Sequence, residues 1–121
     1  MVKTHGLTHI NLRVRDVDRA LRFYREVFGV EVLWHEPDMV QVQTPGTSDL
    51  IALVPHPDGA GTASGVTHFG FRLVDPKDIA AAVKAVESAG GRVLRTGEHA
   101  PGMPYAYVND PDGYEIEIFY E

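Results

Sequence analysis

The sequence predicts an α+β fold made of two βαβββ modules within a single domain, residues 1–121. The first observation is a repeat: residues 6–14, GLTHINLRV, return as residues 65–73, GVTHFGFRL, with Gly, Thr, His and Arg at the same offsets. The second is that apolar residues alternate in both copies, as in a strand with one buried face. The third is that a helical pattern, a glycine stop and further strand patterns follow each copy in the same order.

The first module, about residues 5–56, begins with a strand over the first repeat copy and continues with a helix over residues 19–28. Asp16 or Asp18 is expected to cap the start of this helix, and Gly29 has the residue type that ends one. Short apolar or alternating runs bounded by turn residues predict three further strands. These strands are expected over residues 30–34, 39–43 and 50–54.

The second module, about residues 65–121, follows a linker over residues 56–65 that is rich in Pro, Gly and small residues. Asp75 and Pro76 are expected to open its helix, because Asp caps helices and Pro suits the first helical position. Two glycines end that helix, and a tight turn separates the last two strands. The strands are expected over residues 92–94, 105–109 and 114–120, with the turn at residues 110–113.

Composition and charge exclude some classes of binding partner and some kinds of metal site. The formal net charge of −6 argues against nucleic acid or an anionic membrane as the main partner. The chain has no cysteine, so any metal must be held by histidine and carboxylate side chains. No apolar run approaches the length of a membrane span, and the N-terminus lacks the apolar core of a signal peptide. We therefore expect a cytoplasmic protein.

Three side chains form the candidate metal site. His9 and His68 occupy equivalent positions in the two repeat copies, each on the face opposite the apolar residues. Glu117 alternates with apolar residues on the last strand and therefore shares the corresponding face. A single strand histidine is more often structural, but two equivalent histidines and an in-phase carboxylate favour a shared site. Two imidazoles and one carboxylate bind a divalent cation and leave coordination positions open.

The repeat also predicts how many ligands there are. Pairing Ile51 of the first module with Ile116 of the second aligns Ala52 with Glu117. The first module would then lack a carboxylate at the equivalent position, so the site would have three protein ligands and not four. A register slip of one residue would change this alignment.

At this point the chain resembles the vicinal oxygen chelate superfamily. The paired βαβββ modules carry the resemblance, together with the motif Asp-Pro-Asp-Gly-Tyr-Glu-Ile-Glu at residues 110–117. The resemblance implies a curved, open, mixed β-barrel assembled from two modules, with helices on its outer face. It also implies a homodimer, and it assigns the metal-ligand roles to His9, His68 and Glu117.

Within that superfamily, the C-terminal third resembles the extradiol ring-cleaving dioxygenases. Gly97-x-His99, a short spacer, Tyr107, Asp-Pro-x-Gly and Glu117 match their signature, except that Ala106 stands where a larger side chain is usual. The resemblance implies that His99 and Tyr107 hydrogen-bond the oxygens of a metal-bound, catechol-like diol. It favours Fe(II) or Mn(II), although Zn(II) and Ni(II) suit the same donor set. The alternative for His99 is an exposed loop residue, and for Tyr107 a barrel-wall residue.

Two departures weaken the dioxygenase interpretation. Extradiol enzymes usually have two such domains, and they tend to carry a further catalytic histidine in the region that here reads Ser48-Asp49-Leu50-Ile51. Three alternatives therefore stay open. A glyoxalase-like lyase would need a second glutamate at Ala52, a fosfomycin-resistance-like transferase would need a cationic cluster for a phosphonate, and a drug-binding resistance protein would need no metal site at all.

Overall fold

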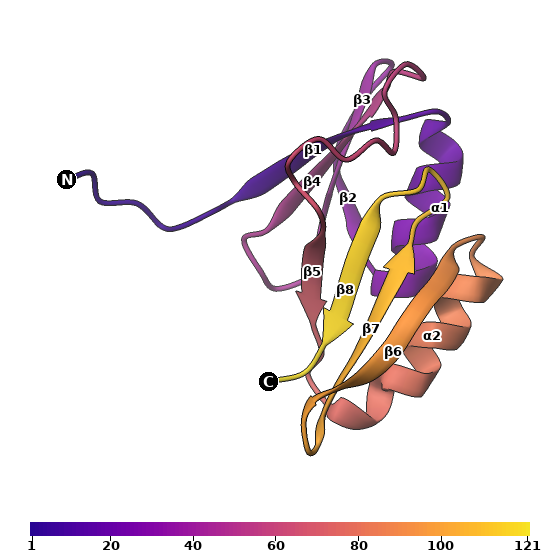
Figure 1. Cartoon of the computed structure of the whole chain (residues 1–121). Coiled ribbons are helices and arrows are strands. Elements are labelled where there is room, and N and C mark those ends of the chain that lie inside the picture. The colour runs from indigo at the N-terminus through magenta and orange to yellow at the C-terminus, as the bar shows by residue number, and fades with distance from the viewer.

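The computed structural model describes all 121 residues and has the predicted α+β architecture. Each module contributes one four-stranded sheet and one main helix (Figure 1). The first module comprises β1 (His9–Val14), α1 (Val17–Phe28), β2 (Glu31–Glu36), β3 (Met39–Gln43) and β4 (Leu50–Pro55). The second comprises β5 (Phe69–Arg72), the 3-10 turn η1 (Pro76–Asp78), α2 (Ile79–Ser88), β6 (Arg92–Ala100), β7 (Met103–Asn109) and β8 (Glu115–Phe119).

The helices begin and end at the residues that their capping chemistry requires. Asp16 caps α1, where its carboxylate accepts a hydrogen bond of 3.0 Å from the backbone N–H of Arg19. Gly29 ends α1 in the left-handed region at φ 64°, which costs glycine little. Asp75 accepts from the N–H of Lys77 at the start of η1, and α2 continues directly from it.

The two sheets have the same topology. The strand orders are β1-β4-β3-β2 and β5-β8-β7-β6, with the first pair parallel and the other two antiparallel in each sheet. Ile10 pairs with Ile51 in the first sheet as Phe69 pairs with Ile116 in the second. Ala52 therefore occupies the position equivalent to Glu117, as the sequence repeat predicts.

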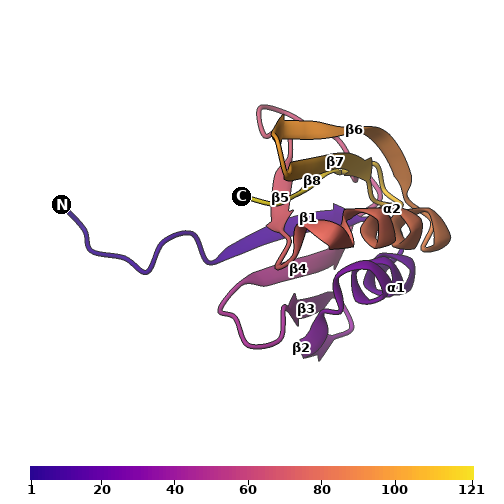
Figure 2. The same cartoon turned by 90° about the horizontal axis from the view of Figure 1, so that it is seen from below.

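One hydrophobic core serves both modules. Its 16 buried residues come from both sheets and both helices, so neither module buries its apolar face alone. Figure 2 shows α1 and α2 beside one another, with one sheet on either side. The rings of Phe28 and Phe71 stack across the modules with centroids 3.8 Å apart, and Tyr24 and Phe23 of α1 are fully buried. The helix-free faces of the sheets remain open, and the sheets do not close into one barrel.

The structure changes the length of two predicted strands. β5 begins at Phe69, so His68 lies immediately before the strand and not within it. β6 runs from Arg92 to Ala100, well beyond the three residues predicted. His99 is therefore a strand residue, and the alternative of an exposed Gly/Pro loop is wrong. Antiparallel pairing with β7 extends β6 across Gly97, which the sequence pattern alone reads as a break.

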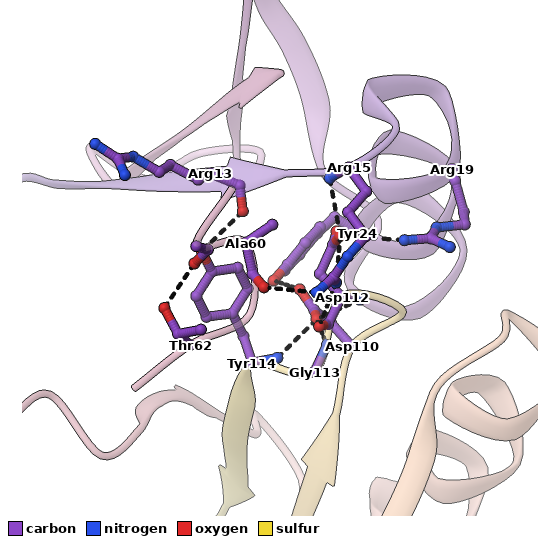
Figure 3. Close-up of polar contacts among 11 residues, drawn as sticks. Arg13, Arg15, Arg19, Tyr24, Ala60, Thr62, Asp110, Asp112, Gly113 and Tyr114 are labelled. Carbon is purple, nitrogen blue, oxygen red and sulfur yellow. Dashed lines mark hydrogen bonds and ion pairs between the residues drawn. The ribbon is translucent and has the colours of Figure 1, made fainter. Parts of the chain in front are cut away.

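A polar network joins the turn between β7 and β8 to the first module (Figure 3). The backbone N–H and guanidinium of Arg15 donate to the carboxylate of Asp112, and the guanidinium of Arg19 adds a 3.1 Å contact. The hydroxyl of Tyr24 donates to Asp110 Oδ2 at 2.7 Å. Both aspartates are buried. Burial raises the pKa of Asp110, although the hydrogen bonds from Tyr24 and backbone N–H groups act in the opposite direction.

The linker is shaped to fit this turn. Gly61 has a φ of +75°, and a Cβ there would lie 1.9 Å from the carbonyl oxygen of Asp112, so only glycine fits. The Arg15 guanidinium also donates to the carbonyl oxygen of Ala60 at 2.9 Å. The first eight residues are exposed and extend away from the body of the molecule (Figure 1). Neither helix is long and apolar enough to cross a bilayer.

Candidate active site on the open face of the second module

The candidate site is built on one row of the second sheet. Backbone pairing aligns Gly70 with Glu117, Glu117 with Tyr107, and Tyr107 with Arg95 across four adjacent strands. Since residues in register share a face, these side chains lie on the open side of the sheet. The absence of a side chain at Gly70 leaves room beside Glu117: a Cβ there would lie 3.1 Å from the Glu117 carbonyl oxygen.

Glu117 is the centre of this row. Its Oε1 lies 2.6 Å from Nε2 of His99, and its Oε2 lies 3.4 Å from Nε2 of His68. The Glu117 side chain is only 14% exposed, whereas the two histidines are more open to solvent. The structure therefore brings together four of the five residues predicted for the site, because Tyr107 also lies beside Glu117.

Tyr107 lies at the edge of this cluster. Its ring meets that of His68 edge to face, with centroids 5.2 Å apart, and the guanidinium of Arg95 lies 3.9 Å from the Tyr107 ring centroid. Arg95 is itself paired with Glu115 at 3.1 Å. Partial desolvation and the Glu117 carboxylate raise the pKa of Tyr107, while Arg95 acts to lower it. Tyr107 therefore presents a protonated hydroxyl at neutral pH.

His9 is not part of this cluster. It lies on β1 of the other sheet and is exposed, and its ring contacts only the hydroxyl of Thr8, with Oγ1 3.1 Å from Nδ1. No group of three His, Asp or Glu side chains within the chain is arranged to hold a metal ion. The predicted convergence of His9, His68 and Glu117 in one cavity does not occur within a single chain.

The histidines nevertheless share a local arrangement. Thr67 Oγ1 lies 3.3 Å from Nδ1 of His68, which repeats the contact between Thr8 and His9. A hydroxyl that accepts from Nδ1–H keeps Nε2 free as the ligand nitrogen. Nε2 is also the nitrogen that His68 directs at Glu117. The donor pair of His68 and Glu117 fits a divalent transition-metal ion in type, and it leaves the remaining positions to another ligand and to substrate.

A cavity of about 380 Å³ lies next to the cluster, between β1 and the linker. His68 contributes to its wall, opposite the cationic side chain of Arg13, and Tyr114 donates to the carbonyl oxygen of Arg13 at 2.7 Å. Thr62 and Ser64 of the linker add hydroxyl groups to the lining. The cavity has the size and mixed polarity of a small-molecule site.

Sequence reasoning missed the buried network around the turn. Asp110 and Asp112 were assigned only to a tight turn, because a single sequence does not show which turn carboxylates are buried. The arginine partners of Asp112 lie more than 90 residues away, and the tyrosine partner of Asp110 lies 86 residues away. The sequence contains little signal for this network: Arg15 and Arg19 lie close to Asp16 in the chain, and nothing in their spacing points to Asp112.

Comparison with known proteins identifies the family. Residues 6–118 match the model of the Glyoxalase/Bleomycin resistance protein/Dioxygenase superfamily. The lactoylglutathione lyase of Haemophilus influenzae is 32% identical over 93% of this chain and 90% of its own length. The catechol-2,3-dioxygenase of Bacillus subtilis is 30% identical over 98% of this chain but 44% of its own length. The chain likewise spans 42% of two plant proteins named as lactoylglutathione lyases, one of them as putative.

Solved structures agree on the fold. The fosfomycin resistance protein FosX of Listeria monocytogenes superposes with a TM-score of 0.82, covering 98% of this chain and 95% of that one, at 17% identity. Such low identity shows a shared architecture and leaves the reaction open. With the family match covering nearly the whole chain, and with the two-module topology that the sequence repeat predicts, the protein belongs to the Glyoxalase/Bleomycin resistance protein/Dioxygenase superfamily, the vicinal oxygen chelate proteins.

Proposed function

We propose that the protein is a metal-dependent enzyme whose site is centred on Glu117 and His68. The observation that carries the proposal is the clustering of a half-buried carboxylate, two histidines and a tyrosine on one open sheet face. A carboxylate in contact with imidazoles at a cavity is a common form of metal and acid–base site. The family supports it, since divalent metals are used among its members.

His9 completes the site from a second copy of the chain. In one chain the open faces of both sheets lack a partner, and every residue of β2 is exposed. Its Trp34 is in register with Gln41 and is an exposed aromatic residue on the open face of the first sheet. Exposed apolar residues on an open sheet face are typical of a surface covered in an oligomer. In a homodimer the first module of one copy can lie against the second module of the other, and each site then has two histidines and one carboxylate.

The reaction we propose is extradiol-type cleavage of a catechol-like diol. His68 and Glu117, with His9 of a second copy, would hold an Fe(II) or Mn(II) ion, which when bound would supply Lewis-acid and redox chemistry for the diol and O₂. The protonated Tyr107 hydroxyl donates a hydrogen bond to a diol oxygen, and Arg95 above its ring limits the build-up of negative charge around Glu117. The cavity beside His68 is large enough to receive the remainder of the substrate and to orient it.

The test is metal analysis of the purified protein, followed by anaerobic loading with Fe(II) and addition of a catechol panel with O₂. Oxygen uptake with formation of a coloured ring-opened product is the expected result. Glu117→Gln should abolish it, whereas Glu98→Gln, a change at an exposed residue of β6, should not. Metal binding without oxygen uptake on any diol would overturn the dioxygenase assignment and leave the metal site standing.

A lyase is the second candidate, because several relatives carry the name lactoylglutathione lyase. The observation against it is Ala52, which stands where a glyoxalase-like site would need its second glutamate. The same purified protein, loaded with Ni(II) or Zn(II), should be given the hemithioacetal of glutathione and methylglyoxal. Thioester formation would favour the lyase, and Ala52→Glu should then raise the rate.

A further inference from the structure

The orientation of the His99 side chain follows from the way β6 pairs with β7, which the sequence motif around His99 does not predict. The register between β6 and β7 shifts between Glu98 and Ala100, so His99 lies in a β-bulge. Bulges turn side chains away from the regular alternation of a strand. This bulge directs the His99 ring at Glu117, which lies two strands away on β8.

The ring of His99 also packs against an aromatic residue of β7. It stacks on Tyr105 with centroids 4.4 Å apart and an interplanar angle of 29°. Tyr105 in turn lies directly over Gly97, where an added Cβ would be 2.6 Å from the tyrosine hydroxyl. Gly97, Tyr105 and His99 therefore form a stack that sets the imidazole in one orientation, with Nε2 facing the Glu117 carboxylate.

The two oxygens of Glu117 have different partners. Oε1 is 2.6 Å from His99, a distance typical of a strong hydrogen bond to a charged acceptor. Oε2 instead faces Nε2 of His68 at 3.4 Å, far enough apart for both to bind a common ion. His99 does not join them as a third donor, because no three such side chains surround one point.

We propose that His99 is a positioning residue that makes Glu117 a one-oxygen ligand. Its Nε2–H occupies Oε1, so that only Oε2 remains available beside His68. This role replaces the contact with substrate oxygens that the dioxygenase motif implies for His99. It rests on the proposed metal site at His68 and Glu117, but it does not depend on which reaction the site performs.

The experiment compares His99→Leu, which cannot donate, with His99→Gln, which retains an N–H donor at a similar reach. His56→Leu is the matched control, because His56 is an exposed linker histidine whose ring hydrogen-bonds only the carbonyl oxygen of Asp58. Mn(II) affinity is measured by titration, and the number of histidine nitrogens on bound Cu(II) by pulsed electron paramagnetic resonance. Circular dichroism establishes that each variant is folded.

We expect His99→Leu to weaken Mn(II) binding by roughly 10- to 100-fold, because the loss of a residue that hydrogen-bonds a metal ligand typically lowers metal affinity by that factor. His99→Gln should restore most of the affinity, and the nitrogen count should be the same in all variants. Loss of one nitrogen in both His99 variants would make His99 a ligand and overturn the proposal. Unchanged Mn(II) affinity in His99→Leu would also overturn it.

A measurement on the metal-free protein separates this proposal from the metal site itself. Long-range proton–nitrogen correlation spectra should show the His99 proton on Nε2, with its resonance lost in Glu117→Ala, which removes the acceptor. A proton on Nδ1 alone would overturn the proposed hydrogen bond whatever the metal result. If the hydrogen bond is present but wild-type protein binds no Mn(II), the proposed metal-dependent function fails, and the positioning role fails with it.

Discussion

The two modules share a topology but not a chemistry. Across the second sheet, the row of paired residues reads Gly70, Glu117, Tyr107 and Arg95. The equivalent row in the first sheet reads Asn11, Ala52, Gln41 and Trp34. One row carries a carboxylate, a phenol and a guanidinium on an open face, whereas the other carries nothing that titrates.

The difference shows that the two modules share the same backbone positions, whereas the side chains at those positions, and hence their chemistry, differ. The histidine just upstream of the row is retained in both copies, with its threonine neighbour. The carboxylate is present in only one. The proposed three-ligand site would therefore take one histidine from the first module and the other two ligands from the second. Four predictions test this asymmetry, from the largest expected effect to the smallest.

Glu117→Gln should give the largest effect. Replacement of a residue that hydrogen-bonds a metal ligand typically lowers metal affinity by roughly 10- to 100-fold. Loss of the only carboxylate ligand should therefore lower the affinity by more than about 100-fold. Mn(II) titration measures it. Gln41→Ala, which removes a polar side chain from the other row, should leave the affinity of the original site unchanged. Equal losses in the two variants would mean that the rows are functionally alike, contrary to the asymmetry.

The turns that precede the last strand of each module provide the second test. In the second module Asp112 is buried and accepts from two arginines, whereas Asp49 in the first is exposed and accepts a single 2.8 Å hydrogen bond from the backbone of Thr44. Asp112→Ala should lower the free energy of unfolding by about 2 to 3 kcal/mol, because its partners are themselves half exposed. Asp49→Ala should cost about 1 kcal/mol.

Urea denaturation with a common slope measures both variants. The difference between them reflects the docking of the modules and not turn formation, because both changes remove an aspartate that bonds a turn. Similar losses for Asp112→Ala and Asp49→Ala would show that the network in Figure 3 contributes no more than a surface turn.

Much of this architecture follows from local sequence signals. The repeat, the caps at Asp16 and Gly29 and the strand alternation depend on near neighbours, so a single sequence reveals them. Fold class and the alignment of Ala52 with Glu117 were predicted in this way, and the family was predicted from the resemblance of its motif at residues 110–117; all three are confirmed. The pairing of His99 with Glu117 was not predicted, since it needs a bulge that only strand pairing creates.

The convergence of the proposed metal ligands depends even less on residues that are near neighbours in the sequence. The sequence placed His9 on the correct face of its strand, and the structure agrees that it is exposed there. How two modules sit relative to one another depends on the shared core and on contacts such as those of Asp112 with Arg15, which join residues far apart in the chain. Periodicity contains no information on that geometry, so the sequence left open whether the three ligands meet within one chain or across a dimer, and within one chain they do not meet.

Alkaline pH tests the buried joint between the modules. Burial, followed by the nearby Asp110 carboxylate, raises the pKa of Tyr24 well above its ordinary value. A raised pKa in the folded state means that stability is intact below the unfolded pKa of about 10 and declines as pH rises beyond it, by about 1.4 kcal/mol per pH unit. Tyr24→Phe lacks this term. Unfolding free energies of both proteins, measured from about pH 8 to about pH 11, should therefore converge as pH rises, and parallel curves would contradict the assignment.

The smallest expected effect concerns the threonine–histidine contact that occurs in both modules. Thr8 and Thr67 make the same contact with the histidine that follows each of them, at 3.1 and 3.3 Å. If both hydroxyls fix the ring so that Nε2 binds the metal, Thr8→Val and Thr67→Val should each weaken Mn(II) binding by about tenfold. Valine retains the shape of threonine, so the loss would reflect the hydroxyl alone. An effect confined to Thr67→Val would mean that His9 is not a ligand, and that the repeat conserves the histidine of the first module for its position in the fold and not for its chemistry.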